Sequence, residues 1–174
     1  MAQEVSNLRM RACEVFFNEE SLGHTNGGVE VEVVRTIQDM KVDKYGDVAV
    51  DKVIVGNRLK VKVILAEWAK SIIRRAIPEG AYTVVGADSK IGIGRMAGDK
   101  LSQYAALLRL HPFDKTASDR NEDLYVFKAV SAEPVTLPYK NDEQNLIEVT
   151  FESLVDESQA NGTLLGRIGD IDVS

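Results

Sequence analysis

Strict alternation of aliphatic and charged residues is the feature that most constrains how this chain folds. After Gly27 and Gly28, residues 29–33 are Val-Glu-Val-Glu-Val, and residues 59–63 are Leu-Lys-Val-Lys-Val. The pattern returns near the C-terminus, where residues 147–152 are Ile-Glu-Val-Thr-Phe-Glu. A period of two is typical of a β-strand with one apolar and one charged face. The sequence therefore predicts a half-buried sheet whose other face is charged and lines a water-filled space.

The first two alternating strands are close together in the chain, so we expect them to pair in antiparallel fashion. This pairing would set Glu30 and Glu32 near Lys60 and Lys62 on one face, as opposite charges across the strands. Isolated carboxylates on strands usually just face the solvent. A charged face that recurs on at least three strands instead suggests one continuous solvated surface shared by those strands.

The remaining elements predict a mainly β domain with one prominent helix. Residues 66–77 have apolar side chains at helical spacing, with Trp68 in the apolar stripe, and Pro78 ends the helix. Residues 101–110 fit a helix or a strand, and both remain open. The Val33-Val34 pair breaks the alternation, which predicts a bulge or a change of facing. We expect an N-terminal arm at 1–14, a β domain at 15–155 and a C-terminal arm at 156–174.

Between the first two strands, residues 39–52 are expected to form a long hairpin. Tyr45-Gly46-Asp47 predicts its turn, and Gly56-Asn57 predicts a second break in the following strand. The hairpin is rich in charge: it contains Asp39, Lys41, Asp43, Lys44, Asp47 and Asp51, with Tyr45 at the turn.

Composition narrows the function classes. The chain has 174 residues, a size that fits one domain with a sizeable core. Its formal net charge of -6 argues against a dedicated nucleic-acid binder, which would carry a basic excess. With one cysteine it forms no intramolecular disulfide, which fits a reducing compartment. The N-terminal residues lack a signal-peptide pattern, and no apolar run is long enough to span a membrane.

Motifs for catalysis or cofactor binding are weak. Residues 92–98, GIGRMAG, are glycine-rich, but their spacing departs from the dinucleotide fingerprint, so a flexible surface loop is the better interpretation. His24 and His111 have no metal-ligand spacing around them, and we expect no metal and no cofactor. A catalytic pair of Cys13 with either histidine stays open, although nothing in the local sequence supports it.

Long regular strands also create a problem at the sheet edges, because open edges template further strand pairing. Closing the sheet through neighbouring subunits would remove those edges and make a ring with a charged lumen. A β-sandwich formed by a single chain would satisfy the same pattern.

An ordered series of segments resembles the tail tube (major tail) proteins of long-tailed bacteriophages. The similarity covers most of the chain and rests on no catalytic motif. Its segments are residues 22–31, residues 45–51, residues 56–68, residues 134–154, Asp156 and residues 165–170.

This resemblance implies a β-sandwich or barrel with one flanking helix, whose inner sheet closes into a ring with neighbouring subunits. It implies stacked hexameric rings around a lumen that holds the tape-measure protein and later conducts DNA without sequence-specific binding. Tail-end proteins would be further partners, with assembly in the host cytoplasm, a final place in the virion tail and no membrane contact. The long hairpin would reach a neighbouring subunit or ring through Asp39, Lys41, Asp43, Lys44, Tyr45, Asp47 and Asp51. The residues expected to face the lumen are Glu30, Glu32, Lys60, Lys62, Glu148 and Glu152.

Other function classes remain as alternatives. An Hcp-like secretion-system tube protein has the same shape but usually stays as free hexamers. A monomeric β-sandwich that binds a glycan or protein should expose aromatic residues at its loop tips, and the placement of Trp68 in a helix core stripe argues against that class. An enzyme would need a clustered pair of titratable residues, which the sequence does not reveal, so we do not expect one.

Overall fold

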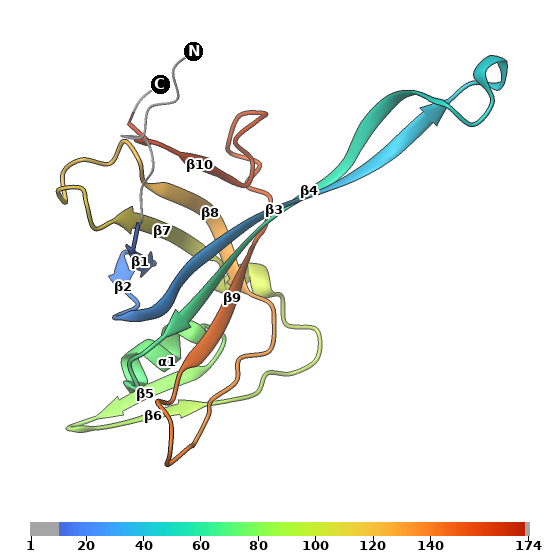
Figure 1. The fold of residues 1–174 in the computed structure, drawn as a ribbon. Helices are drawn as coiled ribbons and strands as arrows, with labels where there is room; N and C mark the ends of the chain where they lie inside the picture. Colours follow the sequence, from blue (N-terminus) through green and yellow to red (C-terminus); the bar gives the residue numbers. More distant parts are fainter. Residues whose placement is uncertain (1–10, 173–174) are drawn as a thin grey trace.

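The computed structural model describes residues 11–172, and in this range the protein is mainly β (Figure 1). One antiparallel sheet contains eight strands, and a separate two-stranded hairpin lies beside the single α-helix. The strands are β1 (Cys13–Phe17), β2 (Glu20–Ser21), β3 (Thr25–Lys41), β4 (Ala49–Leu65), β5 (Ala81–Val85), β6 (Asp88–Gly92), β7 (Ala106–Pro112), β8 (Leu124–Ser131), β9 (Ile147–Ser153) and β10 (Gly166–Ile168). The helix α1 covers Lys70–Ala76, and 3₁₀ turns cover Asp43–Tyr45 and Leu101–Tyr104.

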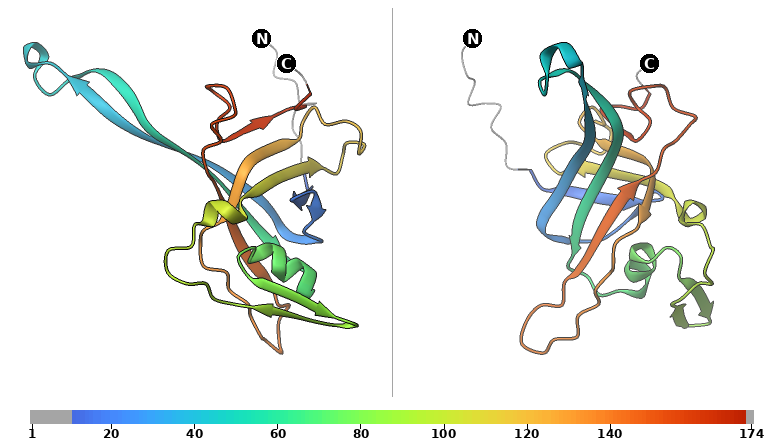
Figure 2. Two further views of the ribbon diagram at one scale, coloured as in Figure 1. Left: turned by 180° about the vertical axis from the view of Figure 1, so that it is seen from behind. Right: turned by 90° about the vertical axis from the view of Figure 1, so that its right-hand side faces the viewer.

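The large sheet has the strand order β2-β1-β7-β8-β9-β4-β3, with β10 pairing onto β8. Its two ends, β2 and β3, do not pair with each other, so residues 11–172 form no closed barrel. The views in Figure 2 show that the sheet is strongly twisted and that the β3–β4 hairpin extends far beyond the rest of the molecule.

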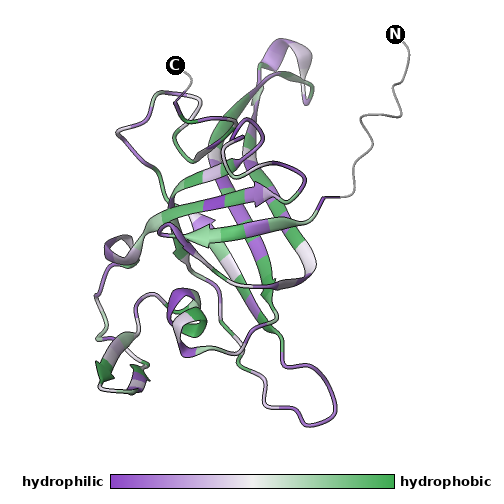
Figure 3. Cartoon of the chain, turned by 90° about the vertical axis from the view of Figure 1, so that its left-hand side faces the viewer, coloured by the Kyte–Doolittle hydropathy of each residue, from purple (hydrophilic) through white to green (hydrophobic). Residues whose placement is uncertain are grey.

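The core lies on the apolar face of the central strands. Val61, Val63 and Leu65 of β4 are fully buried, together with Val149 of β9. Helix α1 adds Ile72, Ile73 and Ala76 to the same apolar cluster. Figure 3 shows polar and apolar residues alternating along the central strands, as a period-two pattern requires.

The β3–β4 hairpin is longer than the sequence predicts. Pairing runs from Thr25↔Leu65 to Lys41↔Ala49, and β4 passes through Gly56-Asn57 without a break. The bulge predicted at Val33-Val34 is absent, because both residues pair in regular register. Register shifts lie instead at three other places: between Thr25 and Val29, between Thr36 and Ile37, where β4 has one extra residue, and between Met40 and Lys41. The predicted turn is confirmed, with Gly46 at a φ of 62°.

The helix is shorter than predicted, beginning at Lys70 rather than at residue 66. Residues 66–69 are held outside it by contacts with the loop before β3. The Ala66 amide donates to the carbonyl of His24 at 2.8 Å, and the His24 amide donates to Oε1 of Glu67 at 2.8 Å. Trp68 is therefore not in a helical core stripe, and its side chain is 40% exposed.

The one segment with two open interpretations is assigned in the structure. Residues 101–110 divide into the 3₁₀ turn Leu101–Tyr104 and the strand β7, so each interpretation describes one half. In the segment expected as a C-terminal arm, Gly166–Ile168 joins the large sheet as β10. The N-terminal arm expected at 1–14 falls largely outside the described residues, and Cys13 and Glu14 already belong to β1.

Candidate functional site

A continuous charged face crosses three neighbouring strands, β3, β4 and β9. Cross-strand partners in an antiparallel sheet point to the same side. Glu30 pairs with Lys62, and Glu32 pairs with Lys60, so these four side chains share one face, as the sequence predicts. Lys60 also pairs with Glu152 on its other side, and Ile64 pairs with Glu148. The six residues expected to face a lumen therefore lie together on one surface.

Ion pairs organise the middle of this surface. Nζ of Lys62 lies 2.6 Å from Oε1 of Glu148, and Nζ of Lys60 lies 2.5 Å from Oε1 of Glu133 in the segment between β8 and β9. The hydrogen bonds to these carboxylates raise the pKa of both lysines above its ordinary value. The bond to Lys60 lowers the pKa of Glu133 in turn. The lysines thus neutralise neighbouring carboxylates, while Glu30 and Glu32 keep the edge of the face acidic.

Sequence reasoning did not identify Glu133 as part of this face. It follows the end of β8, and the chain beyond it runs beside β9, where Thr136 forms an isolated bridge with Glu148. This segment and β9 enclose a hollow of about 440 Å³ on the charged side of the sheet. Only the tertiary pairing brings Glu133 to Lys60, because 73 positions separate the two residues in the chain.

The tip of the β3–β4 hairpin holds the second group of predicted residues. Asp39 forms an ion pair with Lys52 at 2.7 Å, and Lys41 forms one with Asp47. Nζ of Lys44 lies 5.6 Å from the ring centroid of Tyr45. The hairpin beyond the core, residues 36–56, has no buried side chain at all. Large apolar side chains are exposed on it, namely Ile37, Met40, Val42, Tyr45, Val48, Val50, Val53, Ile54 and Val55.

An isolated two-stranded hairpin is marginally stable in water. Exposed aliphatic side chains in this number on such a ribbon are typical of an interaction surface. Two exposed ion pairs, Asp39–Lys52 and Lys41–Asp47, join residues near the tip. They leave Asp43 and Asp51 as hairpin carboxylates with no ion pair among the described residues.

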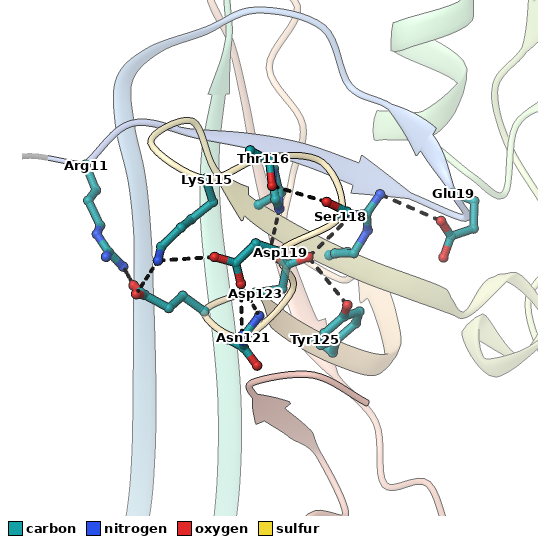
Figure 4. Close-up of polar contacts among 12 residues, drawn as sticks. Arg11, Glu19, Lys115, Thr116, Ser118, Asp119, Asn121, Asp123 and Tyr125 are labelled. Atoms are coloured by element: carbon teal, nitrogen blue, oxygen red, sulfur yellow. Dashed lines mark hydrogen bonds and ion pairs between the residues drawn. The ribbon is translucent and has the colours of Figure 1, made fainter. Parts of the chain in front are cut away.

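A buried polar cluster lies beside the loop between β7 and β8, and sequence reasoning missed it (Figure 4). Asp123 is fully buried, and Nδ1 of His111 lies 2.6 Å from its Oδ1. Nη1 of Arg109 is 3.4 Å from its Oδ2, and the Tyr125 hydroxyl donates to Oδ2 at 3.4 Å. The Gly169 amide donates to the Asp123 carbonyl, so the same residue ties the C-terminal segment to this loop.

A histidine–aspartate pair can serve nucleophilic catalysis when a hydroxyl or thiol lies on the other ring nitrogen. In the loop of residues 113–123, Thr116 and Ser118 hydrogen-bond each other at 3.2 Å instead. Cys13 pairs with Pro112, the neighbour of His111 in β7, so Cys13 and His111 point to opposite faces of the sheet. Burial raises the pKa of the Cys13 thiol, which disfavours a reactive thiolate. The arrangement favours a structural role for the buried pair.

An exposed aromatic pair is a further feature that sequence reasoning missed. The rings of Trp68 and Tyr139 meet edge to face with centroids 5.0 Å apart. Tyr139 is 85% exposed. The two residues come from the segment before α1 and from the segment between β8 and β9, so only the fold brings them together.

Other classes of site find little support in residues 11–172. No group of three or more His, Cys, Asp or Glu side chains in that range could hold a metal ion. No helix there is long and apolar enough to cross a membrane. The glycine-rich residues 92–98 precede a 3₁₀ turn and a strand, rather than the α-helix that a dinucleotide-binding loop requires.

With the geometry in view, the chain was compared with known proteins. No model of a known protein family matches it, and no curated protein matches it either.

Proposed function

We propose that this chain is a structural subunit of a bacteriophage tail tube, which self-assembles as stacked hexameric rings and conducts DNA during ejection. The observation that carries the proposal is the two-sided character of strands β3, β4 and β9. One side of β4 and β9 is packed in the core, and the other side is a continuous charged surface with no aromatic residue on the paired strand positions.

Such a surface suits the wall of a DNA conduit. Duplex DNA binds basic grooves through its phosphates, so a wall with paired lysines and an acidic edge lowers its adhesion. In this proposal Glu30, Glu32, Lys60, Lys62, Glu148 and Glu152 face the lumen. The sheet closes into a ring through neighbouring copies, which covers the free edge of β3.

The exposed hairpin supplies the contact between subunits, and its residues 39–52 reach a neighbouring copy. The tape-measure protein would fill the lumen before DNA, and tail-end proteins would cap the tube. Assembly would take place in the host cytoplasm, and the finished product would belong to the virion tail.

Negative-stain electron microscopy of the purified protein across a concentration series tests this function. Rings or tubes with a lumen of about 20 Å or more, enough for duplex DNA, are the expected result. Single rings that never stack at any concentration would favour the Hcp-like secretion-system alternative. A monomer at every concentration, also after addition of preformed tail-tip complexes, would contradict a tube function.

Replacing residues 39–52 with a two-residue Asn-Gly turn is the matched variant. We expect a folded monomer with unchanged core packing, because none of these residues is buried. Tubes of normal appearance from this variant would remove the hairpin from the assembly mechanism.

The exposed Trp68–Tyr139 pair favours one second candidate, a binding module for a glycan or protein. Trp68 is the single tryptophan of the chain, so its fluorescence reports directly on this surface. A saturable change of that fluorescence with a glycan, lost in Tyr139→Ala, would support this candidate over the tube.

A further inference from the structure

Part of β9 has no strand partner on one of its two sides. On one side, β4 pairs with β9 along residues 147–152. On the other side, β8 pairs only with residues 151–153. Within the part of the chain that the structure describes, no strand pairs with residues 147–150 on that side. These residues are therefore an edge of the sheet, at the end of the charged face opposite to β3.

Residues 132–146, which we call the strap, cover this edge. They leave β8, pass beside β9 and return to its start (Figure 1). In the described range, the strap pairs with the β9 backbone at one isolated bridge, Thr136↔Glu148. Pro134 and Pro138 lie two residues to either side of Thr136 and have no amide N–H to donate, which keeps this pairing short.

The strap has the two-faced pattern of a strand. Thr136 shares the charged face with Glu148, because cross-strand partners point to the same side. Its neighbours Val135 and Leu137 point to the other side, where they are partly buried against the core. The strap thus fills the place of a further strand without forming one.

Strand β3 carries the same pattern and is open along its outer edge. Glu32 lies on the charged face, whereas Val31 and Val33 lie on the apolar side. The two valines are 37% and 61% exposed, although they belong to the main sheet. They match Val135 and Leu137 in chemistry and spacing, so β3 of a second copy has the side chains to replace the strap beside β9.

The charges on this face favour such a replacement. The face carries three cations and five carboxylates, namely Arg58, Lys60, Lys62, Glu30, Glu32, Glu133, Glu148 and Glu152. Nζ of Lys60 reaches across β9 to Glu133 of the strap, at 2.5 Å from its Oε1. Glu30 and Glu32 have no ion pair among the described residues. Removal of the strap lowers the acidic excess and frees Lys60 for a carboxylate of the incoming strand.

A strap that stayed in place would become a central strand of a closed ring, paired with β9 on one side and with β3 of the next copy on the other. Proline removes a hydrogen bond from the ladder and is therefore confined to edge strands and bulges. With Pro134 and Pro138 on either side of its one bridge, the strap is suited to an edge and not to the middle of a continuous wall.

We propose that the strap is an edge guard, which blocks ring closure in the free chain and is displaced from β9 by β3 of a second copy. The inference rests on the proposed self-assembly and names the surface that receives β3. Covering an unpaired edge with a loop is a general protection against unwanted strand pairing. A strand that forms a full ladder with residues 147–150 competes well with a guard that forms one bridge.

A disulfide that fastens the strap to β9 tests this directly. Partners in an antiparallel pair have Cα atoms roughly 4.5–5.5 Å apart, within the range that a disulfide spans. Thr136→Cys with Glu148→Cys, in a Cys13→Ala background, is the strap lock, and both positions are exposed. Val84→Cys with Ser89→Cys, partners in the β5–β6 hairpin, is the control lock in the same background. Circular dichroism verifies that each chain folds.

Sedimentation velocity and electron microscopy follow assembly with and without reductant. The oxidised strap lock should lose assembly and stay monomeric, and reduction should restore rings and tubes. The control lock should assemble in both states. If the oxidised strap lock forms tubes as readily as its reduced form, the strap stays in the wall and the edge guard is wrong, while the tube function stands. If the unmodified chain stays monomeric even with preformed tail-tip complexes, the tube function itself fails.

Loosening the strap is the opposite test. Tyr139 packs edge to face on Trp68 with ring centroids 5.0 Å apart, and Oε1 of Gln144 accepts a hydrogen bond from Nδ2 of Asn26 at 3.3 Å. A chain with Tyr139→Ala and Gln144→Ala should assemble at a lower protein concentration than the unmodified chain. Val85→Ala, at an exposed position of the β5–β6 hairpin, should leave that concentration unchanged. An unchanged or higher concentration for the loosened strap would overturn the edge guard.

Discussion

The inner half of the long hairpin, residues 29–35 and 57–63, and the outer half, residues 36–56, are parts of the same two strands with different surroundings. In the inner half, Val61 and Val63 are fully buried beneath the sheet and Leu59 is nearly so. In the outer half no side chain is buried, although it also contains many aliphatic residues. The charged residues of the inner half spread over a sheet face, whereas those of the outer half pair across a free ribbon.

What differs is the number of neighbouring strands. Strand β9 supports β4 only as far as Lys60, and Gly166 of β10 lies close to Leu59. Beyond that point the hairpin has no further strand to lie on. Alternation therefore sets which side chains share a face, while the extent of the adjoining strands sets whether that face is buried. The outer half has a pattern suited to burial and no burial inside one chain, which is the physical reason to expect a partner.

The strongest test of this comparison places one charge in each half. Val63→Asp puts an unpaired carboxylate among fully buried side chains and should cost at least about 4 kcal/mol of the free energy of unfolding. Val53→Asp lies on the exposed ribbon and should change it by less than about 0.5 kcal/mol. Urea unfolding of both variants measures the difference, and equal losses would contradict the division into two halves.

A second test compares the two halves by adding a single methyl group at two glycines, Gly166 in β10 and Gly56 in the outer half. A Cβ on Gly166 would lie 2.4 Å from the Tyr125 carbonyl and 2.9 Å from Leu59, so β10 would be displaced from the inner half. Gly166→Ala should therefore lower the free energy of unfolding by roughly 1–3 kcal/mol and loosen the contact between β10 and β4.

The matched control in the outer half is Gly56→Ala. Its Cβ would lie 3.8 Å from the Thr36 hydroxyl, an ordinary contact, and the backbone there is compatible with alanine. We expect a change in the free energy of unfolding of less than about 1 kcal/mol, in either direction. A large loss in Gly56→Ala would show that the outer half is packed more tightly than its exposure indicates.

The sequence predicts the inner half well because its evidence is local. Period-two alternation at 29–33, 59–63 and 147–152 places the charged residues on one face, and chain proximity predicts the pairing of Glu30 with Lys62. Proximity and alternation do not reveal where a third strand ends, so the exposure of Ile37 could not be predicted.

The errors elsewhere have the same non-local origin. Helical spacing continues through Trp68, but contacts of residues 66 and 67 with the His24 backbone hold that segment outside the helix. The pairing of His111 with Asp123 depends on the loop between β7 and β8, and the spacing of the two residues in the sequence does not predict it. A residue directly before a strand, as Asp123 is, gives too little information to be identified as a buried partner.

The smallest expected effect concerns the ion pair that joins the inner half to the segment after β8. Lys60 lowers the pKa of Glu133, so this carboxylate binds protons more weakly in the folded chain than in the unfolded one. Its contribution to stability is fully present above the ordinary glutamate pKa and is lost as the pH falls through the lowered value. The thermal midpoint of Glu133→Gln should therefore fall less than that of the unmodified chain on acidification below pH ~4.5.

Carbon-detected NMR titration of Glu133 measures the cause directly. In the unmodified chain its midpoint should lie below that of an ordinary glutamate, and in Lys60→Gln it should return toward the ordinary value. No such return would mean that the Thr150 hydroxyl, the second hydrogen-bond partner of Glu133, holds the carboxylate in its ionised form. The charged face would then depend less on β4 than the comparison of the two halves implies, because Thr150 belongs to β9.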